Sequence, residues 1–564
     1  MQRCGVLLGV AALTMACTPQ ASKHGTPNPS VPPQDSAPIV SPTSPASAST
    51  SPSAAITSPG SALNSTGPDG AIVAGLIPLP VSATSDDSNS FTFTATTQIV
   101  TGQNPDVAEV GTDLAAVLRP STGFGFPVLQ STDVVPNNSV VLQLGPTDAT
   151  LGTEGYELTI SKSGVLLTAN DATGLFRGVQ TMRQLLPASV DSASVQPGPW
   201  RIAGGHIVDY PRYAYRGAML DVTRHFFPVR TVERYIDELA LYKVNVLHLH
   251  LSDDQGWRIA IDAWPKLATR GGSTQIGGGN GGYYTKADYT AIVQYAQAHF
   301  MTVVPEIDVP SHSNAALASY AELNCSGVAP ALYTGPRVGF SSLCVSKAVT
   351  YKFLDDVVGE LAALTPGPYI HLGGDEAQAT SASDYVTFVQ KAQAIVEAHG
   401  KSLMGWADIA KAKLDKGSVA QYWNTADRGV SARNAVTQGV AVVMSPSSHA
   451  YLDQKYTPAT KLGLDWAGHV EVRDAYAWDP DTSVGIPAGS ILGVEAPLWS
   501  ETLHNLSDVE YMAWPRMAGI AEIGWSPSAA RDWNTYRTRL AQQATRWATL
   551  GINFYRSPQI DWAS

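Results

Sequence analysis

The stretch Tyr369-Ile-His-Leu-Gly-Gly-Asp-Glu376 predicts a short buried strand that ends in two glycines and two acids. Strand-favouring and apolar residues fill positions 369–372, and the glycines permit a sharp turn or a close approach of backbone to ligand. Asp375 and Glu376 then follow the carboxyl end of the strand, where an α/β barrel carries its active site. The same two acids could simply begin a helix, because acidic residues favour the first helical turn. The surrounding sequence decides between these interpretations.

Strands and helices alternate from residue 211 onward. The predicted strands are 217–222, 244–251, 302–307, 369–372, 402–406, 419–423, 440–444 and 491–498. Helical patterns lie between most of them, at 229–242, 288–299, 349–364 and 383–399. Eight strands with crossover connections in this length predict an α/β protein in which residues 211–564 form one (β/α)8 TIM barrel.

A smaller α+β domain is predicted before the barrel, at residues 69–210. Alternating segments at 91–96 and 140–144 predict strands, and 156–161 with 164–169 predict a hairpin. A helix is expected over 172–186, where apolar residues recur at helical spacing. No catalytic constellation stands in this region, so we interpret it as an accessory domain.

The first 68 residues have the composition of an export leader and a tether. Residues 1–17 combine one arginine with a short apolar run, which predicts a signal peptide. Thr14-Met15-Ala16-Cys17 is similar to a bacterial lipobox, although Thr14 replaces the usual leucine; the alternative is an ordinary secretory signal. Residues 18–68 are rich in Ser, Pro and Thr and predict a disordered linker. We therefore expect an extracellular or cell-surface protein, with a lipid on Cys17 as one outcome.

Charge and cysteine usage exclude some partners. The formal net charge of -12 argues against nucleic acid. Of the four cysteines, only Cys325 and Cys344 lie beyond the leader. In an exported protein we expect them to form one disulfide, and two free buried thiols are the alternative. No CxxC pair or tight His/Cys cluster predicts a zinc site.

Acids and tryptophans recur at the ends of the predicted barrel strands. Any one of them has an ordinary explanation, such as a surface ion pair or a core indole, but their repetition at one end of the barrel does not. Carboxylates and arginine bind sugar hydroxyls, and indoles pack on the C–H faces of sugars. The candidate residues, in chain order, are Arg224, Asp253, His312, Asp375, Glu376, Trp406, Trp423, Tyr451, Asp453, Trp466, Trp499 and Glu501.

Residues 211–555 resemble glycoside hydrolase family twenty, the bacterial secreted β-N-acetylhexosaminidases. The motifs that carry the resemblance are LDVTRHFF (220–227), LHLHLSDDQGWRI (247–259), PEIDVPSHSNA (305–315), HLGGDE (371–376) and VEAPLWSE (494–501). GLFRGVQT (174–181) also resembles the accessory domain of that family. The resemblance implies an exo-acting enzyme on oligosaccharides that contain N-acetylhexosamine.

The resemblance further implies a retaining, substrate-assisted mechanism, a recognised exception to the scheme with two enzymic carboxylates. In it the 2-acetamido oxygen of the substrate attacks the anomeric carbon and forms an oxazolinium intermediate. Glu376 would protonate the leaving oxygen and later activate water. Asp375 would hold the acetamido N–H, and Tyr451 would bind the acetamido oxygen. This mechanism needs no metal and no cofactor, so we expect neither.

The remaining roles also follow from the resemblance. The indoles of Trp406, Trp423 and Trp499 would wall the acetamido group, which positions it for attack. Trp466 would be a platform for the next sugar unit. A barrel glycosidase of other specificity, such as an endo-acting chitinase, remains an alternative.

Three polar residues would hold ring hydroxyls at the closed end of the site: Arg224, Asp453 and Glu501. Asp253 and His312 would stand behind Glu376, with the imidazole between the two carboxylates, and would tune the pKa of the acid. An inactive sugar-binding barrel is a second alternative, since fold does not imply function; such a protein would be expected to lose an acid or the tyrosine.

Overall fold

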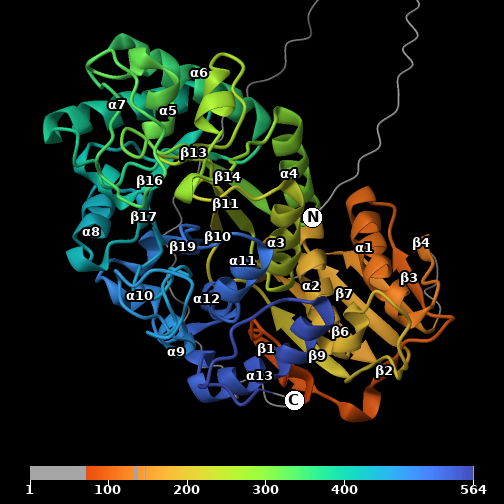
Figure 1. Cartoon of the computed structure of the whole chain (residues 1–564). Coiled ribbons are helices and arrows are strands. Elements are labelled where there is room, and N and C mark those ends of the chain that lie inside the picture. Colours follow the sequence, from red (N-terminus) through yellow and green to blue (C-terminus); the bar gives the residue numbers. More distant parts are fainter. Residues whose placement is uncertain (1–70, 132–136, 146–147, 563–564) are drawn as a thin grey trace, which may run out of the picture. The chain divides into compact units, whose positions relative to one another are not determined.

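Eight parallel strands close into a barrel in the computed structural model of the chain (Figure 1). In barrel order they are β10 (Tyr215–Asp221), β11 (Val246–His250), β14 (Thr302–Glu306), β15 (Tyr369–His371), β16 (Ser402–Trp406), β17 (Val419–Tyr422), β18 (Ala441–Met444) and β19 (Ile491–Leu498). The last strand pairs in parallel with the first, which closes the barrel. The predicted fold is confirmed, and each strand begins and ends within two residues of its predicted bounds.

Helices surround this barrel. The longer ones are α3 (Val229–Leu241), α4 (Lys286–Ala298), α6 (Ala348–Leu364), α7 (Ala382–Ala398), α8 (Val430–Thr437), α11 (Leu506–Ala513), α12 (Arg516–Trp525) and α13 (Trp533–Leu550). The first four are the predicted helices. Short helices lie in the loops, at α5 (Asn314–Ser319), α9 (Val472–Tyr476) and α10 (Pro480–Ser483). Between β16 and β17 the chain forms only a 3-10 segment, Ala407–Lys411, where the simplest barrel has a full helix.

The structure describes residues 71–131, 137–145 and 148–562. The predicted signal peptide (1–17), the linker (18–68) and Cys17 lie outside these residues. None of the helices in the described ranges has both the length and the apolar composition that a membrane crossing requires.

The accessory domain is a mixed sheet with two helices on one face, which confirms the predicted α+β class. The strand order is β1 (Ser82–Ser85), β9 (Gly205–Asp209), β6 (Tyr156–Ser161), β7 (Gly164–Ala169), β5 (Ser139–Leu144), β3 (Gln98–Thr101) and β4 (Val128–Gln130). Helices α1 (Pro105–Thr122) and α2 (Ala172–Leu185) contact each other and the sheet. The predicted hairpin is β6–β7, and the predicted helix is α2.

Two features of this domain differ from the expectation. The predicted strand at 91–96 is wrong beyond β2 (Phe91–Thr92), which pairs with β8 (Arg201–Ile202). The chain turns after it, because the Thr94 N–H donates to Thr97 Oγ1 at 2.9 Å and the Thr97 N–H to the Thr94 carbonyl at 3.0 Å. Threonine side chains compete with strand pairing in this way. Helix α1 was not predicted at all.

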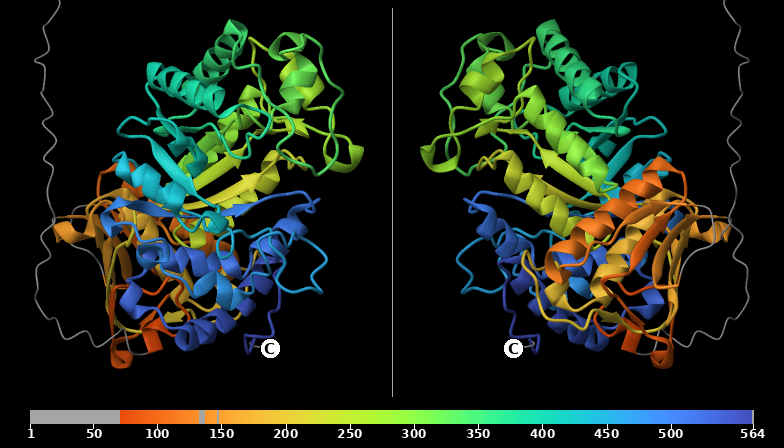
Figure 2. Two further views of the ribbon diagram at one scale, coloured as in Figure 1. Left: turned by 90° about the vertical axis from the view of Figure 1, so that its left-hand side faces the viewer. Right: turned by 90° about the vertical axis from the view of Figure 1, so that its right-hand side faces the viewer.

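A buried ion pair joins the accessory sheet to the barrel. Lys243, which follows α3, places Nζ 2.7 Å from Asp209 Oδ2 at the end of β9. The other oxygen of Asp209 accepts the indole N–H of Trp525, the last residue of α12, at 2.8 Å. The C-terminal helix α13 also reaches this domain through Arg546, which pairs with Asp191. In both views of Figure 2 the dark blue C-terminal helix lies beside the orange accessory domain.

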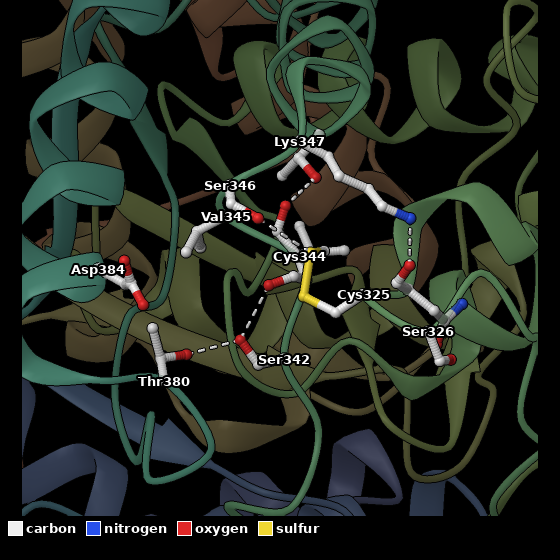
Figure 3. Close-up of a disulfide and its surroundings, with 12 residues drawn as sticks. Cys325, Ser326, Ser342, Cys344, Val345, Ser346, Lys347, Thr380 and Asp384 are labelled. Carbon is white, nitrogen blue, oxygen red and sulfur yellow. Dashed lines mark hydrogen bonds between the residues drawn. A yellow bond between two sulfur atoms is a disulfide. The ribbon is translucent and has the colours of Figure 1, made fainter.

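The predicted disulfide is confirmed. Cys325 and Cys344 are bonded, with their Cα atoms 4.8 Å apart, in the long loop between β14 and α6. Figure 3 shows the bond beside Ser342, whose hydroxyl lies 2.6 Å from the hydroxyl of Thr380. Thr380 belongs to the loop that follows Glu376, so the disulfide-bonded loop is fastened to the segment that carries the candidate acid.

Candidate active site

The candidate residues meet at the carboxyl end of the barrel. Each one ends a strand or follows one in the next loop, and the carboxyl ends of parallel strands all face the same way. Consecutive strands in the chain are also neighbours in the barrel, so residues far apart in sequence come together. The strands and the residues that follow them are β10 with Arg224; β11 with Asp253; β14 with His312; β15 with Asp375 and Glu376; β16 with Trp406; β17 with Trp423; β18 with Tyr451, Asp453 and Trp466; and β19 with Trp499 and Glu501.

Two glycines shape the turn that presents the acids. Gly373 and Gly374 have φ angles of 60° and 94°, in the left-handed region that glycine enters without strain. A side chain at Gly373 would also be blocked, because its Cβ would lie 1.9 Å from Asp308 Oδ1. The same Asp308 oxygen accepts the N–H of Gly374 at 3.1 Å. The turn therefore depends on glycine and on a buried aspartate from the neighbouring strand end.

His312 lies between Asp253 and the two acids. Its Nδ1 is 3.2 Å from Asp253 Oδ1, and its Nε2 is 3.5 Å from Glu376 Oε2 and 3.7 Å from Asp375 Oδ2. Burial opposes a charge on the imidazole, but Asp253 and Asp308 outweigh it and raise the pKa of His312 well above its usual value. A cationic imidazole beside Glu376 is thus the arrangement that these carboxylates favour.

Asp375 and Glu376 differ in their surroundings. The Asp375 side chain is 13% exposed and that of Glu376 is 28% exposed. Burial, with a smaller contribution from the neighbouring Glu376, raises the pKa of Asp375 to about 7, although His312 opposes this. Asp375 Oδ1 is buried and has no hydrogen-bond partner among the described residues. An amide N–H of a ligand would supply the partner that this oxygen lacks.

Aromatic rings form a continuous group beside the acids. The Trp406 and Trp499 ring centres are 5.7 Å apart, and Tyr451 lies 6.5 Å from Trp499 and 5.7 Å from Trp466. Trp406 is 1% exposed, whereas Trp466 is 53% exposed. Trp423 stands 6.0 Å from Trp466. The group thus runs from a buried indole to one that faces solvent, which suits a sugar bound inside and a second sugar outside.

The hydroxyl-binding candidates are buried or half-buried, and two of them carry unpaired oxygens. Asp453 Oδ1 and Glu501 Oε2 have no hydrogen-bond partner among the described residues. Burial, together with nearby Glu501, raises the pKa of Asp453 to about 8. Arg224 is engaged, since its Nη2 is 2.7 Å from Asp253 Oδ2 and its guanidinium lies 4.7 Å from the Trp499 ring centre. Arg224 therefore also holds the carboxylate that contacts His312.

Sequence reasoning missed the buried groups beneath these residues. His248 and His250 of β11 alternate along the strand, so both point to the same side of it, and Glu306 ends β14. All three are fully buried and in contact. The signal was present in the segments Leu247-His-Leu-His250 and Pro305-Glu306, because ionisable residues inside apolar strands require partners.

Some of these side chains have the spacing of metal ligands. In the described part of the chain, His248, Glu306 and His371 bring ligand atoms within 4.8 Å of one another, and so do His312, Asp375 and Glu376. The Glu306 carboxylate is already engaged by protein groups, including the Trp406 indole N–H at 2.9 Å. The expectation of no metal and no cofactor stays a prediction.

Comparison with known proteins identifies the family. Residues 213–528 match the catalytic domain of glycosyl hydrolase family 20, and residues 73–210 match domain 2 of that family. A β-N-acetylhexosaminidase from Cellulomonas fimi is 41% identical over 488 residues, which cover 86% of this chain and 97% of the relative.

Solved structures agree with this match. The family 20 β-N-acetylhexosaminidase from Streptomyces coelicolor A3(2) is 53% identical, with a TM-score of 0.84 over 87% of this chain and 99% of the other. A variant of the Streptomyces plicatus β-hexosaminidase, solved with its product GlcNAc, is also 53% identical, with a TM-score of 0.84 over 87% of this chain and 98% of the other. The chain therefore belongs to glycosyl hydrolase family 20, as a glycoside hydrolase of the β-N-acetylhexosaminidase type.

Proposed function

We propose that the protein releases terminal, non-reducing N-acetylglucosamine or N-acetylgalactosamine from oligosaccharides such as chitobiose, by a retaining, substrate-assisted reaction. In the first step the acetamido carbonyl oxygen bonds to the anomeric carbon, the glycosidic bond breaks, and Glu376 gives its proton to the leaving oxygen. In the second step Glu376 takes a proton from water, which attacks the anomeric carbon and opens the oxazolinium ring. Two inversions at one carbon retain its configuration.

The observation that carries this proposal is the convergence of both acids on one imidazole. Nε2 of His312 is 3.7 Å from Asp375 and 3.5 Å from Glu376. One ring nitrogen of His312 and one oxygen of each carboxylate lie within 4.8 Å of one another. A retaining pair with an enzymic nucleophile usually has carboxyl groups about 5–5.5 Å apart, facing each other across the sugar. Side chains that share one neighbour suit adjacent tasks on the same side of the substrate, with the acid at the leaving oxygen and Asp375 at the acetamido N–H.

Tyr451 supports the proposed binding of the acetamido group beside Asp375. It lies in the loop after β18 and is 2% exposed, with its ring 6.5 Å from that of Trp499. Burial, then the nearby Asp375 and Asp453, raises the pKa of Tyr451 well above its usual value. The hydroxyl therefore stays protonated and can donate to the acetamido oxygen that Asp375 orients from the nitrogen side.

Exo action is proposed from the unpaired oxygens at the far side of the site. Asp453 Oδ1 and Glu501 Oε2 are buried without partners, and the hydroxyls of a terminal sugar would supply donors for both. Trp466, which is 53% exposed, would then face the next sugar unit. An internal sugar carries a further residue where a terminal one has a free hydroxyl, so these two acids would exclude it.

One pair of substrates tests the activity. An aryl β-N-acetylglucosaminide and the matching aryl β-glucoside differ only in the acetamido group. A substrate-assisted enzyme should therefore hydrolyse the first and show almost no hydrolysis of the second. Equal rates on both would favour a barrel glycosidase of other specificity, and no hydrolysis of either by folded protein would favour an inactive sugar-binding barrel. Products from chitin oligomers separate the two modes of action: exo action yields the monosaccharide from the start, and endo action yields shorter oligomers.

The nucleophile is tested by trapping. A 2-fluoro glycoside that lacks the acetamido group should leave the protein mass unchanged under the proposed mechanism. A stable covalent sugar on Asp375 or any other carboxylate, seen by intact mass measurement, would show an enzymic nucleophile and refute substrate assistance.

The proposed location is outside the cell or at its surface. Support comes from the sequence, through the apolar leader at 1–17, the Ser/Pro-rich segment at 18–68 and the cysteine at position 17. The Cys325–Cys344 disulfide is consistent with an oxidising compartment.

A further inference from the structure

Glu306 occupies the centre of the buried polar groups beneath the site. It is the last residue of β14 and has no exposed surface. Its Oε1 accepts the indole N–H of Trp406 at 2.9 Å and lies 3.0 Å from His371 Nδ1. Its Oε2 is 2.5 Å from His250 Nδ1 and 3.0 Å from His248 Nε2. Four side chains from three other strands therefore meet at this one carboxylate.

One of these contacts continues to the candidate acid. His250 turns its other nitrogen, Nε2, to Asp253 Oδ2 at 2.9 Å. Asp253 Oδ1 is 3.2 Å from His312 Nδ1, and His312 Nε2 is 3.5 Å from Glu376. His250, Asp253 and His312 thus form one chain of contacts, the orienting chain, from Glu306 to the acid.

The contact of Glu306 Oε1 leads to Trp406, the indole proposed to pack on the acetamido group. Trp406 packs 5.7 Å from Trp499, and His250 touches the same Trp499 edge-on at 4.8 Å. The two oxygens of Glu306 therefore hold neighbouring parts of the site. A rotation of the carboxylate that kept one contact would lose the other, because a carboxylate is planar and rigid.

Charge strengthens the contacts of Glu306 with Trp406 and with His250. Burial opposes ionisation of Glu306, but His250, His371 and His248 outweigh it and hold the pKa of Glu306 well below its usual value. Burial likewise opposes a charge on His250, yet Glu306 and Asp253 raise its pKa well above the usual range. An ionised carboxylate accepts stronger hydrogen bonds than a neutral amide, and a doubly protonated imidazole can donate to Glu306 and Asp253 together.

We propose that Glu306 is a positioning residue for the reaction: one of its oxygens fixes the Trp406 indole against the acetamido group, and the other fixes the orienting chain behind Glu376. The inference rests on the proposed roles of Trp406 and Glu376. Glu306 itself is fully buried, so it would act through these neighbours and not by contact with substrate. Its effect is to align the acetamido oxygen of the substrate and the carboxyl group of Glu376 from one buried residue.

Glu495 offers a matched control. It lies inside β19 and is likewise fully buried. Its carboxylate accepts from the Tyr215 hydroxyl at 2.5 Å and Gln421 Nε2 at 2.7 Å, and it lies 2.9 Å from His248 Nδ1. Glu495 and Glu306 therefore lie against opposite ring nitrogens of the same His248. Among the contacts of the described residues, Glu495 has none with Trp406 or the orienting chain.

The experiment compares Glu306→Gln with Glu495→Gln by two measurements. The inhibition constant of a thiazoline that mimics the bicyclic intermediate reports the acetamido site. The ratio of kcat/KM for aryl N-acetylglucosaminides with good and poor leaving groups reports the acid. Glu306→Gln should weaken the thiazoline about tenfold or more, which corresponds to ~1.4 kcal/mol, and should slow the poor leaving group about tenfold more than the good one. Glu495→Gln should change each measurement less than about twofold.

Several outcomes would overturn the inference while the wild type remains active. They are unchanged values in folded Glu306→Gln, or the same changes in Glu495→Gln, which would show a general effect of barrel charge. If Glu306→Gln does not fold, two variants that each alter one side of the arrangement decide. Trp406→Phe loses the indole N–H together with part of the ring, and should weaken the thiazoline more than it alters the leaving-group ratio. His250→Gln should alter the leaving-group ratio more than the binding of the thiazoline. If both variants changed both measurements alike, or neither, the proposed coupling would be wrong. Failure of the wild type on every N-acetylhexosaminide would instead refute the proposed function.

Discussion

Nε2 of His312 lies 3.5 Å from the Glu376 carboxylate, although the two residues are 64 positions apart and belong to loops after different strands. The other imidazole nitrogen faces Asp253 at 3.2 Å, so the ring is held from behind. A cationic imidazole in this place lies beside the carboxylate that, in the proposed reaction, first gives a proton and then takes one.

Glu376→Gln tests this assignment. The amide keeps the shape of the side chain but cannot donate a proton as a carboxylic acid does. We expect kcat/KM to fall about 10²- to 10⁴-fold for substrates with poor leaving groups. Aryl substrates with very good leaving groups need little protonation and should lose less in the first step. Steady-state kinetics across a series of leaving groups measures the difference, and a uniform loss in folded protein would argue against this role.

Gly373→Ala should disrupt the turn before the acids. The new Cβ would lie 1.9 Å from Asp308 Oδ1, and the backbone has a φ of 60°. Strain and collision together should abolish activity and lower the melting temperature. Gly400→Ala is the control, because Gly400 has a similar φ of 72° but nothing within 4 Å of its Cβ position. There we expect only about 1 kcal/mol of backbone strain and full activity. Equal effects of the two substitutions in thermal melts would contradict the steric argument.

Lys243→Met should loosen the junction between the accessory sheet and the barrel. It leaves the Asp209 carboxylate buried without its cation, although Tyr156 and Trp525 still donate to it. Removing one partner of a buried pair costs about 3–5 kcal/mol, so the denaturant midpoint should fall clearly. Lys286 forms more exposed pairs with Asp262 and Glu360, and Lys286→Met should cost less, about 1 kcal/mol. Aryl-substrate kinetics at low temperature should be unchanged in both, and an unchanged midpoint for Lys243→Met would refute this account.

Cys17→Ser tests the proposed lipid anchor. If Cys17 carries lipid, the wild type should remain with the membrane fraction and the variant should be released to the medium, because a covalent lipid supplies the attachment. Fractionation of cells that express each form measures this. Equal release of both would show an ordinary cleaved signal and leave the enzyme activity untouched.

The barrel was predictable because its strands follow a simple rule. Segments such as 402–406 and 491–498 are apolar runs that end abruptly at a tryptophan or an acid, and the structure has both with the predicted bounds. The candidate residues could therefore be collected from the strand ends. The placement of the His312 imidazole between Asp253 and Glu376 came from the resemblance, and the structure brings these three side chains together.

Three features were not predicted, each for a different reason. The strand expected at 91–96 stops early because Thr97 caps a turn through its hydroxyl. Helix α1 did have a signal, since Asn104 accepts the N–H groups of Asp106 and Val107 and Pro105 stands at the first helical position. Glu306 is different: in sequence it is one acid at a strand end, and only packing reveals that four side chains share its two oxygens.

Asp375→Asn should make the protein more stable above neutral pH. In the folded protein burial raises the pKa of Asp375 to about 7, from an ordinary value of 3.8. Between these values the folded state keeps a proton that the unfolded chain releases. Stability therefore falls as the pH rises through this window, and the full cost applies above the folded pKa. Asparagine does not titrate and avoids that cost.

The size of the effect follows from the same shift. One pKa unit corresponds to about 1.4 kcal/mol, and a kcal/mol moves the melting temperature of a large domain by about 2 °C. Without ligand, Asp375→Asn should thus melt several degrees above the wild type at pH 8, and the difference should become small at pH 3, below the ordinary pKa of 3.8, where the aspartate is mostly neutral in both states. The same variant should bind a thiazoline more weakly and turn over slowly, because it removes the charge opposite the developing cation. Scanning calorimetry at both pH values is the measurement. A variant less stable than the wild type at pH 8 would contradict this prediction. It would show that the ionised Asp375 carboxylate is stabilised by its contact with His312 by more than its burial costs.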